Sequence, residues 1–304
     1  MRHYNIPISF LGEETRDGYT ISSDKKQIWA VQLDILQEIA MICNKHDIKY
    51  FAIGGTLLGA VRHKGYIPWD DDLDIAMYRE DYNKFCEIAP KELHNPFFFQ
   101  TEDTDPGYLL RHAKVRNSNT TAILSIQRDK KYRFNQGIFV DIFPLDRIPD
   151  NIEERNEYFR ELFKTWGYVY KYSAFINRND SIISELDPNY TREQIQDRAS
   201  DYYKIFEELS AKYNDVLTTE ACIIALTVLP NKLNSNWIWK YDFFREFEIV
   251  PFEFLSIPIP KHSEEVLSTT YGNWREFVIG NNLHGEIVFD VDTPYMDYIN
   301  CRII

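Results

Sequence analysis

An acidic run in the first third of this 304-residue chain has the residue types and the spacing of a cation site. It reads Asp70-Asp71-Asp72-Leu73-Asp74, so four carboxylates fall within five positions. Four such charges repel one another unless they are solvated or share cations. On an extended segment alternate side chains share a face, so we expect Asp70, Asp72 and Asp74 to point together and Asp71 to point away. Carboxylate oxygens on one side of a strand suit Mg²⁺ (or Mn²⁺), a hard cation.

The alternative to a metal site is an ordinary solvated acidic turn. Trp69 directly precedes the run, and the alternation over residues 73–77 predicts a strand directly after it. This context favours carboxylates at the start of a strand inside a cleft.

A glycine pair precedes the acidic run. Gly54, Gly55 and Thr56 lie between a predicted short strand at residues 50–53 and a segment at 56–62 that can start a helix. Glycines let backbone N–H groups approach a ligand closely, and a helix N-terminus favours anions. A lone Gly-Gly is more often only a turn, but its place before the acidic run suggests a phosphate-binding turn beside a metal site.

Asp141 lies inside the apolar run of residues 138–143, a predicted strand. A charge in such surroundings is costly to bury unless it is paired or bound to metal. A salt bridge to a buried Arg or Lys is one explanation, and a metal ligand or general base is the other. Arg62, Lys114 and Arg116 are candidates for gripping phosphate oxygens, although each alone is more often a surface charge.

Periodicity indicates the elements that must position these residues. An amphipathic helix is expected from about residue 25 to 46, and Lys114, Val115 and Arg116 form a plausible strand. Beyond residue 150 the pattern is mostly helical and rich in aromatics, with helical segments predicted at 151–175, 191–217 and 263–271. We therefore expect an α+β fold in a single domain, 1–304, with a catalytic core at 25–150 and a largely helical elaboration at 151–304.

The bulk composition narrows the function classes. A net charge of -13 disfavours nucleic-acid binding, because the densest basic cluster, residues 128–131, contains its own acid. The four cysteines lie far apart without a CxxC pair, and no apolar run is long enough to span a bilayer. We expect a cytoplasmic protein. His63 and His284 are possible acid–base groups.

The motifs resemble those of a known family. Residues 51–77, FAIGGTLLGAVRHKGYIPWDDDLDIAM, closely resemble the core motif of the LicD family, which includes the fukutin-type proteins. Residues 137–149, GIFVDIFPLDRIP, are similar to that family's second block. KVRNSNT at 114–120 and the pair at 271–272 are also similar to the family pattern, and the resemblance extends from about residue 27 to the end.

The resemblance implies a nucleotidyltransferase-like fold, a small mixed sheet flanked by helices. It also implies transfer of a phospho-headgroup from a CDP-linked donor to a glycan hydroxyl, releasing CMP. Phosphocholine is the best-known group in bacterial members, and relatives transfer ribitol phosphate. By position, Asp72 and Asp74 match the family's metal-binding pair, Asp70 joins them, and Asp141 matches the later carboxylate.

These roles combine into one mechanistic hypothesis. Asp72 and Asp74 hold Mg²⁺ on the donor diphosphate, and Asp141 orients or deprotonates the acceptor hydroxyl. Gly55 and Thr56 contact the phosphates. An aromatic box could hold a choline quaternary ammonium by cation–π attraction. Candidates for such a box are Tyr66 and Trp69.

Other functions remain open at this point. The transferred group could be glycerol phosphate, ribitol phosphate or a phosphonate headgroup, and a lipid-linked glycan acceptor would bring the protein to the inner face of the membrane. A true nucleotidyltransferase acting on NTP would use the same glycine and carboxylate pattern. A non-catalytic scaffold ranks last, because all four carboxylates are present.

Overall fold

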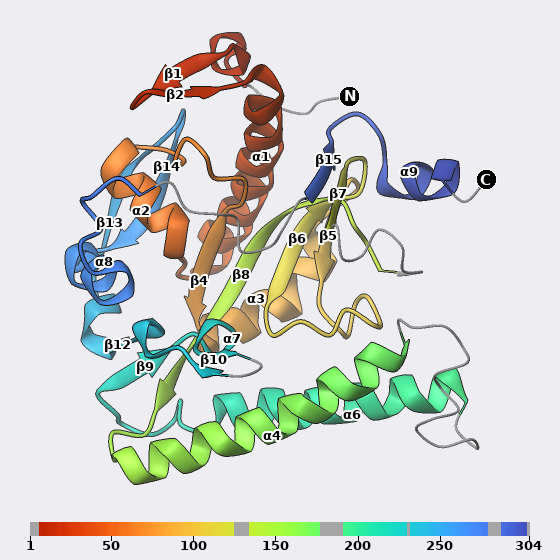
Figure 1. Ribbon diagram of the computed structural model, residues 1–304, viewed down its shortest axis with the longest axis vertical. Coiled ribbons are helices and arrows are strands. Elements are labelled where there is room, and N and C mark those ends of the chain that lie inside the picture. Colours follow the sequence, from red (N-terminus) through yellow and green to blue (C-terminus); the bar gives the residue numbers. More distant parts are fainter. Residues whose placement is uncertain (1–5, 125–133, 177–190, 230–231, 279–286, 303–304) are drawn as a thin grey trace.

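A computed structural model describes residues 6–124, 134–176, 191–229, 232–278 and 287–302 of the chain (Figure 1). The basic cluster at 128–131, the polar stretch at 177–190 and His284 lie outside these residues.

A mixed sheet forms the centre of the molecule. Its strands lie in the order β5 (Phe97–Gln100), β6 (Ala113–Asn117), β8 (Ile138–Ile148), β4 (Asp74–Tyr78) and β3 (Phe51–Ala52). Strands β4 and β8 run parallel, and the other described pairs of this sheet are antiparallel. Two short strands, β9 (Glu220–Cys222) and β12 (Ile238–Lys240), continue it from the far end of β8. The expected α+β class, with a mixed sheet flanked by helices, is confirmed.

Two helices pack against this sheet. Helix α1 (Ser23–His46) contacts β6 and β8, and α3 (Arg79–Glu92) contacts β4, β5 and β8. Helix α1 begins where the Ser22 hydroxyl accepts a hydrogen bond from the backbone N–H of Lys25, an N-cap that satisfies one free donor. The apolar positions at helical spacing are buried, among them Trp29, Leu33 and Leu36. The helix predicted at residues 25–46 is confirmed.

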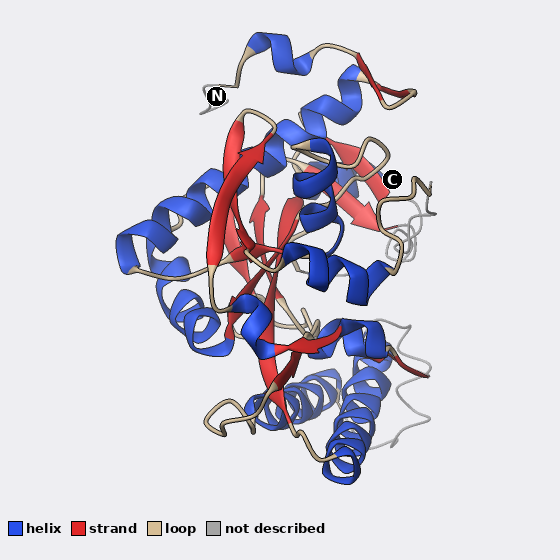
Figure 2. Cartoon of the chain, turned by 90° about the vertical axis from the view of Figure 1, so that its left-hand side faces the viewer, coloured by secondary structure: helices blue, strands red, loops and turns tan. Residues whose placement is uncertain are grey.

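A long helical hairpin forms a second apolar cluster below the sheet in both views (Figures 1 and 2). Helices α4 (Ile152–Ile176) and α6 (Arg192–Ala211) pack along each other, and α6 begins with a capping box between Thr191 and Gln194. Strand β8 joins the two clusters, because Ile142 is buried with the sheet and Ile148 is buried with the hairpin.

The remaining elements surround this frame. Helical character beyond residue 150 is concentrated in α4 and α6, and short strands dominate from residue 220 onward. The remaining described elements are η1 (Ile8–Leu11), β1 (Glu14–Arg16), β2 (Tyr19–Ile21), α2 (Gly54–His63), β7 (Thr121–Leu124), α7 (Ile224–Thr227), β10 (Val228–Leu229), β11 (Lys232–Leu233), η3 (Ser235–Trp237), η4 (Tyr241–Phe244), β13 (Phe247–Phe252), β14 (Leu255–Pro260), α8 (Ser263–Tyr271), β15 (Ile287–Asp290) and α9 (Tyr295–Arg302). Within the described residues, none of the helices has the length and apolar character that a bilayer span requires.

A buried ion pair connects the sheet to both groups of helices. Arg79, at the start of α3, donates to both carboxylate oxygens of Asp146 in β8, at 2.7 and 2.6 Å, and to Glu207 of α6 at 2.9 Å. Asn214 donates a further hydrogen bond to Asp146 at 2.8 Å. Because the Asp146 side chain is fully buried, its removal would leave the Arg79 guanidinium with Glu207 as its remaining ion-pair partner among the described residues.

We expect Asp146→Ala to lower the free energy of unfolding by about 3–5 kcal/mol, the usual cost of breaking a buried pair. Urea denaturation followed by circular dichroism measures this change. The control is Asp242→Ala, which breaks an exposed pair with Arg245 and should cost at most about 0.5 kcal/mol. Equal effects of the two substitutions would contradict the role assigned to the buried pair.

Candidate functional site

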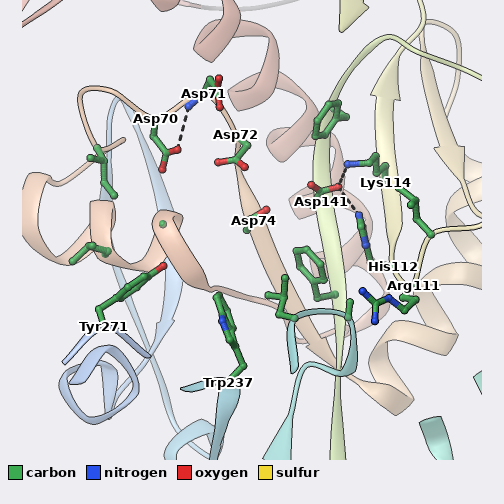
Figure 3. Close-up of a pocket in the computed structure, with 18 of the residues that line it drawn as sticks. Asp70, Asp71, Asp72, Asp74, Arg111, His112, Lys114, Asp141, Trp237 and Tyr271 are labelled. Atoms are coloured by element: carbon green, nitrogen blue, oxygen red, sulfur yellow. Dashed lines mark hydrogen bonds and ion pairs between the residues drawn. The ribbon is translucent and has the colours of Figure 1, made fainter. Parts of the chain in front are cut away.

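One cavity of about 750 Å³ brings most of the predicted site residues together (Figure 3). Its walls come from the acidic run, from strands β6 and β8, from α2 and α4, and from the segment beyond residue 220. Its charged lining residues are Arg62, Asp70, Asp71, Asp72, Asp74, Arg111, His112, Lys114, Arg116, Asp141 and Glu276. The cavity is therefore lined by charges of both signs, with the acidic run and the basic residues of 111–116 on opposite sides (Figure 3).

Sheet register aligns three charged side chains. Asp74 of β4 lies opposite Asp141 of β8, and Asp141 lies opposite Lys114 of β6. Residues directly opposite each other on neighbouring strands share a face of the sheet. Along β8, Phe139, Asp141 and Phe143 alternate onto this same face, and all three line the cavity.

Helix α1 holds the acidic run through its backbone. Lys25, Trp29 and Gln32 donate hydrogen bonds to the successive carbonyl oxygens of residues 69–71, at 2.9, 3.1 and 2.8 Å. Their spacing of four and three positions places the donors on one face of the helix. The helix thus holds the run by its backbone carbonyls, and all three side chains of residues 70–72 line the cavity.

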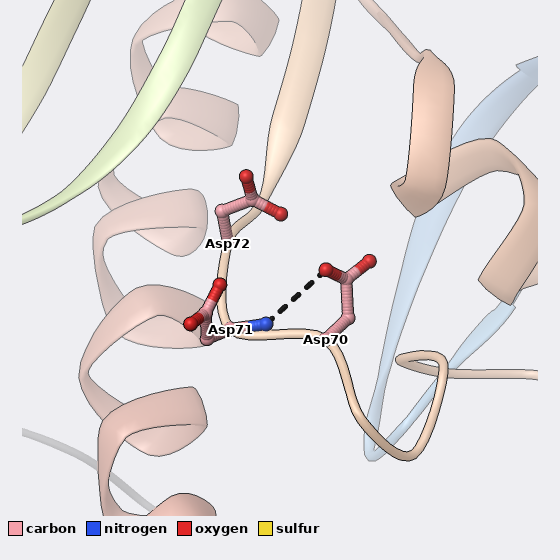
Figure 4. A group of neighbouring side chains, drawn as sticks. All are labelled: Asp70, Asp71 and Asp72. Carbon is pink, nitrogen blue, oxygen red and sulfur yellow. Dashed lines mark hydrogen bonds between the residues drawn. The ribbon is translucent and has the colours of Figure 1, made fainter. Parts of the chain in front are cut away.

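The carboxylates of the run point to both sides of the chain. Asp70 and Asp72 extend to one side and Asp71 to the other, towards α1 (Figure 4), as the predicted alternation requires. One oxygen from each of Asp70, Asp71 and Asp72 nevertheless lies within 4.8 Å of the others, so Asp71 also belongs to the group that could hold a cation. Asp71 is therefore a possible cation ligand, although the alternation of side chains predicted that it would point away from the other carboxylates.

Burial and mutual repulsion make these carboxylates hard to ionise together. Burial raises the pKa of Asp70 well above its usual range, and the charge of Asp72 adds to the increase. Burial likewise raises the pKa of Asp74, with further contributions from Asp72 and Asp141. A bound cation would offset this repulsion.

The glycine turn brings α2 against the carboxylates. Gly54 has a positive φ of 59°, and a Cβ built on Gly55 would lie 2.6 Å from an oxygen of Asp70. The backbone N–H of Asp74 donates to the hydroxyl of Thr56 at 2.8 Å. Thr56 is buried and does not line the cavity, so its hydroxyl positions Asp74 and does not face a ligand. The glycines allow this close approach because they lack side chains.

Asp141 is paired with two basic groups. It forms an ion pair with Lys114, and one of its oxygens lies 3.1 Å from Nε2 of His112, a ring whose pKa is lowered by burial. Burial would raise the pKa of Asp141, but the charges of Lys114 and His112 outweigh it and hold the pKa below its usual range. Of the explanations left open by the sequence, a salt bridge is present. A carboxylate held in its ionised form is a poor general base.

The two predicted arginines also lie at the cavity. Arg62 donates to the backbone carbonyls of Trp274 and Glu276, at 2.9 and 3.3 Å, and Arg116 donates to Gln100 and to the carbonyl of Gly137. Both line the cavity, but part of their donor capacity is used by the protein itself. His63 does not line it and instead contacts Asp17 at 2.7 Å.

Of the two residues predicted for an aromatic box, Tyr66 does not line the cavity. Tyr66 is 2% exposed and stacks on Trp29, with ring centroids 4.5 Å apart, so it belongs to the core. The spacing of Tyr66 from the acidic run contains no pattern that predicts its burial. Trp69 does line the cavity.

Sequence reasoning missed several residues of the lining. Trp237 and Tyr271 lie near Gly54, within 3.4 and 3.8 Å of a Cβ built there. Both come from segments distant from the acidic run: the pair at 271–272 resembles the family pattern without a role attached to it, and Trp237 belongs to no motif. His112 could have been found, because it precedes β6 at the same alternate spacing as Lys114 and Arg116, whereas Arg111 falls outside that alternation.

Comparison with known proteins identifies the family of the chain. Residues 47–182 match the family model described as LicD/FKTN/FKRP, nucleotidyltransferase domain. The chain belongs to the LicD family, as the sequence motifs predicted.

Three relatives illustrate the range of the match. A 241-residue region is 33% identical to uncharacterized protein RP689 of Rickettsia prowazekii, covering 78% of this chain and 84% of that protein. A 121-residue region is 38% identical to lipopolysaccharide cholinephosphotransferase LicD of Haemophilus influenzae, covering 40% of this chain and 43% of that protein. A 40-residue region is 50% identical to human ribitol 5-phosphate transferase FKRP, covering 13% of this chain and 8% of that protein. The chain thus spans less than half the length of the two named transferases.

The hydrogen bonds from α1 predict a local effect. Trp29→Phe removes the donor to the Asp70 carbonyl, and a lost hydrogen bond of about 1 kcal/mol should speed amide hydrogen exchange at residues 70–72 about fivefold. The matched control is Trp239→Phe, which removes another buried indole donor, to Thr270 at 3.1 Å. If the two variants change exchange at 70–72 equally, α1 does not hold the acidic run in this way.

Proposed function

We propose that this protein transfers a phospho-headgroup from a CDP-linked donor to a hydroxyl of a cell-surface glycan and releases CMP. The observation that carries the proposal is the cavity in which the acidic run faces the Asp141–Lys114 pair on one sheet face. Phosphocholine is the favoured headgroup, because the relative from Haemophilus influenzae is named a cholinephosphotransferase. Ribitol or glycerol phosphate is the alternative, supported by the match to FKRP.

The acidic run fits a divalent cation. Its ligands would be oxygens alone, several of them are largely buried, and their repulsion is what a cation would offset. Asp70, Asp72 and Asp74 would hold Mg²⁺ or Mn²⁺, with Asp71 within reach, and Asp141 beside Asp74. When bound, the metal supplies charge neutralisation to the donor phosphates and orients them.

The chain's own residues provide the rest. The acceptor oxygen forms a new bond to the headgroup phosphorus, and the bond from that phosphorus to the bridging oxygen breaks with its electron pair passing to CMP. The hydroxyl proton passes to a phosphate oxygen of the leaving CMP. Lys114 and Arg62 add positive charge to the cavity in which negative charge develops. Asp141 keeps Lys114 in place and orients the acceptor. Its low pKa argues against the proton-accepting role expected from the sequence.

Aromatic side chains in the cavity lining favour choline as the transferred headgroup. Trp69, Trp237, Tyr271 and Trp274 line the cavity, and the two from residues 237 and 271 lie beside the glycine turn. Indole and phenol faces attract a quaternary ammonium by cation–π interaction. This set replaces the box that included Tyr66.

Substitution of the metal pair tests the proposal. We expect Asp72→Asn and Asp74→Asn each to lower CMP release by more than about 100-fold, as for the loss of a main electrostatic stabiliser. The assay measures CMP from CDP-choline, CDP-ribitol and CDP-glycerol with Mg²⁺ and glycan acceptors. Exposed Asp242→Asn is the control. Unchanged turnover in the first two variants would refute the metal role, and turnover of NTP alone would identify a nucleotidyltransferase.

The glycine turn gives a second test. Gly55→Ala places a methyl group where Asp70 Oδ2 lies 2.6 Å away, so the carboxylate must move. We expect Mn²⁺ affinity, measured by electron paramagnetic resonance, to fall about tenfold, the loss of one charge-assisted interaction. Gly167→Ala is the control, because nothing lies within 4 Å of its Cβ in helix α4. Mn²⁺ affinity equal in both variants would exclude Asp70 from the site.

A further inference from the structure

Arg111 is a cavity residue to which the proposed chemistry assigns no role. It directly precedes β6 and lines the cavity, where Figure 3 shows its guanidinium pointing inward on the same side as His112 and Lys114. Burial alone lowers its pKa to about 10. The group stays charged at neutral pH, because even this lowered value lies far above pH 7.

The charge of Arg111 lacks a balancing carboxylate. In the described part of the chain its contacts are a hydrogen bond to the backbone carbonyl of Val228 and a cation–π contact with Trp166, at 4.7 Å from the ring centroid. No carboxylate among the described residues forms an ion pair with it. By contrast, Lys114 is paired with Asp141, and Arg79 with Asp146. A cation in such surroundings is costly without a carboxylate partner, and among the described residues it has none, which favours an anion bound in the cavity as its partner.

The geometry of Arg111 suits a forked contact. A guanidinium carries five N–H donors in one plane, and the Trp166 ring supports its orientation. One donor is used by the Val228 carbonyl, which leaves others for a ligand in the cavity. The guanidinium of Arg116, which donates to Gln100 and to the Gly137 carbonyl, adds a second positive charge to the cavity lining and favours an anion there.

We infer that Arg111 and the Trp166 ring beneath it form a phosphate-binding subsite in the cavity, separate from the carboxylates of the acidic run. The ligand chemistry is a phosphate group, which a planar guanidinium grips through two parallel hydrogen bonds. Two sources present this group to the cavity: the second phosphate of the donor, or a phosphate carried by the acceptor. This inference rests on the proposed function for the identity of those two molecules.

Inorganic phosphate is the first probe, titrated calorimetrically in EDTA so that no metal contributes. We expect Arg111→Gln to weaken phosphate binding at least about tenfold relative to wild type, the usual scale for hydrogen bonds to a charged group. Arg111→Lys keeps the charge but loses the fork, and should lie between the two. Arg245→Gln, an exposed arginine in an i,i+3 pair, is the matched control and should bind phosphate as wild type does.

The source is resolved by two further titrations with Mg²⁺ present. If Arg111→Gln weakens CDP but leaves CMP unchanged, the subsite holds the donor's second phosphate. If phosphate still binds wild-type protein saturated with CDP, and Arg111→Gln abolishes that binding, the subsite holds an acceptor phosphate. Phosphate affinity within twofold of wild type in both Arg111 variants overturns the inference.

Thermal unfolding distinguishes phosphate binding by Arg111 from a purely structural role of this residue. If Arg111 only connects Val228 and Trp166, Arg111→Gln should lower the midpoint of thermal unfolding, and added phosphate should raise that midpoint by as much as in wild type. The phosphate subsite predicts that this increase is lost. Asp74→Asn tests the proposed function and should leave phosphate binding in EDTA intact, so either idea can fail alone.

Discussion

Like charges held close together in a partly buried cavity are the constraint on which this structure depends. The carboxylates of residues 70–74 repel one another, and burial strengthens that repulsion by removing the screening water. Several of the contacts that hold them there are made to the backbone. Helix α1 binds the carbonyls of residues 69–71, and the Thr56 hydroxyl binds the N–H of Asp74. The raised pKa values of Asp70 and Asp74 reflect the electrostatic cost of ionising these groups together, and a bound cation would offset that cost.

The sequence predicted the parts of the site that carry a local signal. The acidic run, the glycine turn, Asp141 and the amphipathic helix at 25–46 all follow from patterns within a few residues. Their pairing across strands did not follow, because the register that sets Asp74 opposite Asp141 depends on contacts between segments about 65 positions apart in the chain.

The inward turn of Tyr66 and the inward-facing hydroxyl of Thr56 were missed for a related reason. Both residues belong to a motif that resembles a known family, and the resemblance identified the segment without giving the direction of each side chain. Tyr66 packs on Trp29 of helix α1, which lies 37 positions earlier in the chain, and this contact holds its ring in the core. Direction is decided by tertiary packing, which a linear pattern does not contain.

Strand β8 carries two buried carboxylates with different surroundings. Asp141 faces the cavity, and Asp146, five positions later, pairs with Arg79 and Asn214 beside the helices. Because side chains alternate along a strand, the odd separation places the two acids on opposite faces. The number of residues between Asp141 and Asp146 therefore determines both that one acid faces the cavity and that the other reaches Arg79. A single-residue insertion between them would turn one acid to the wrong face, whereas an insertion of two would restore the alternation. Natural variants of β8 are expected to differ in composition far more readily than in length.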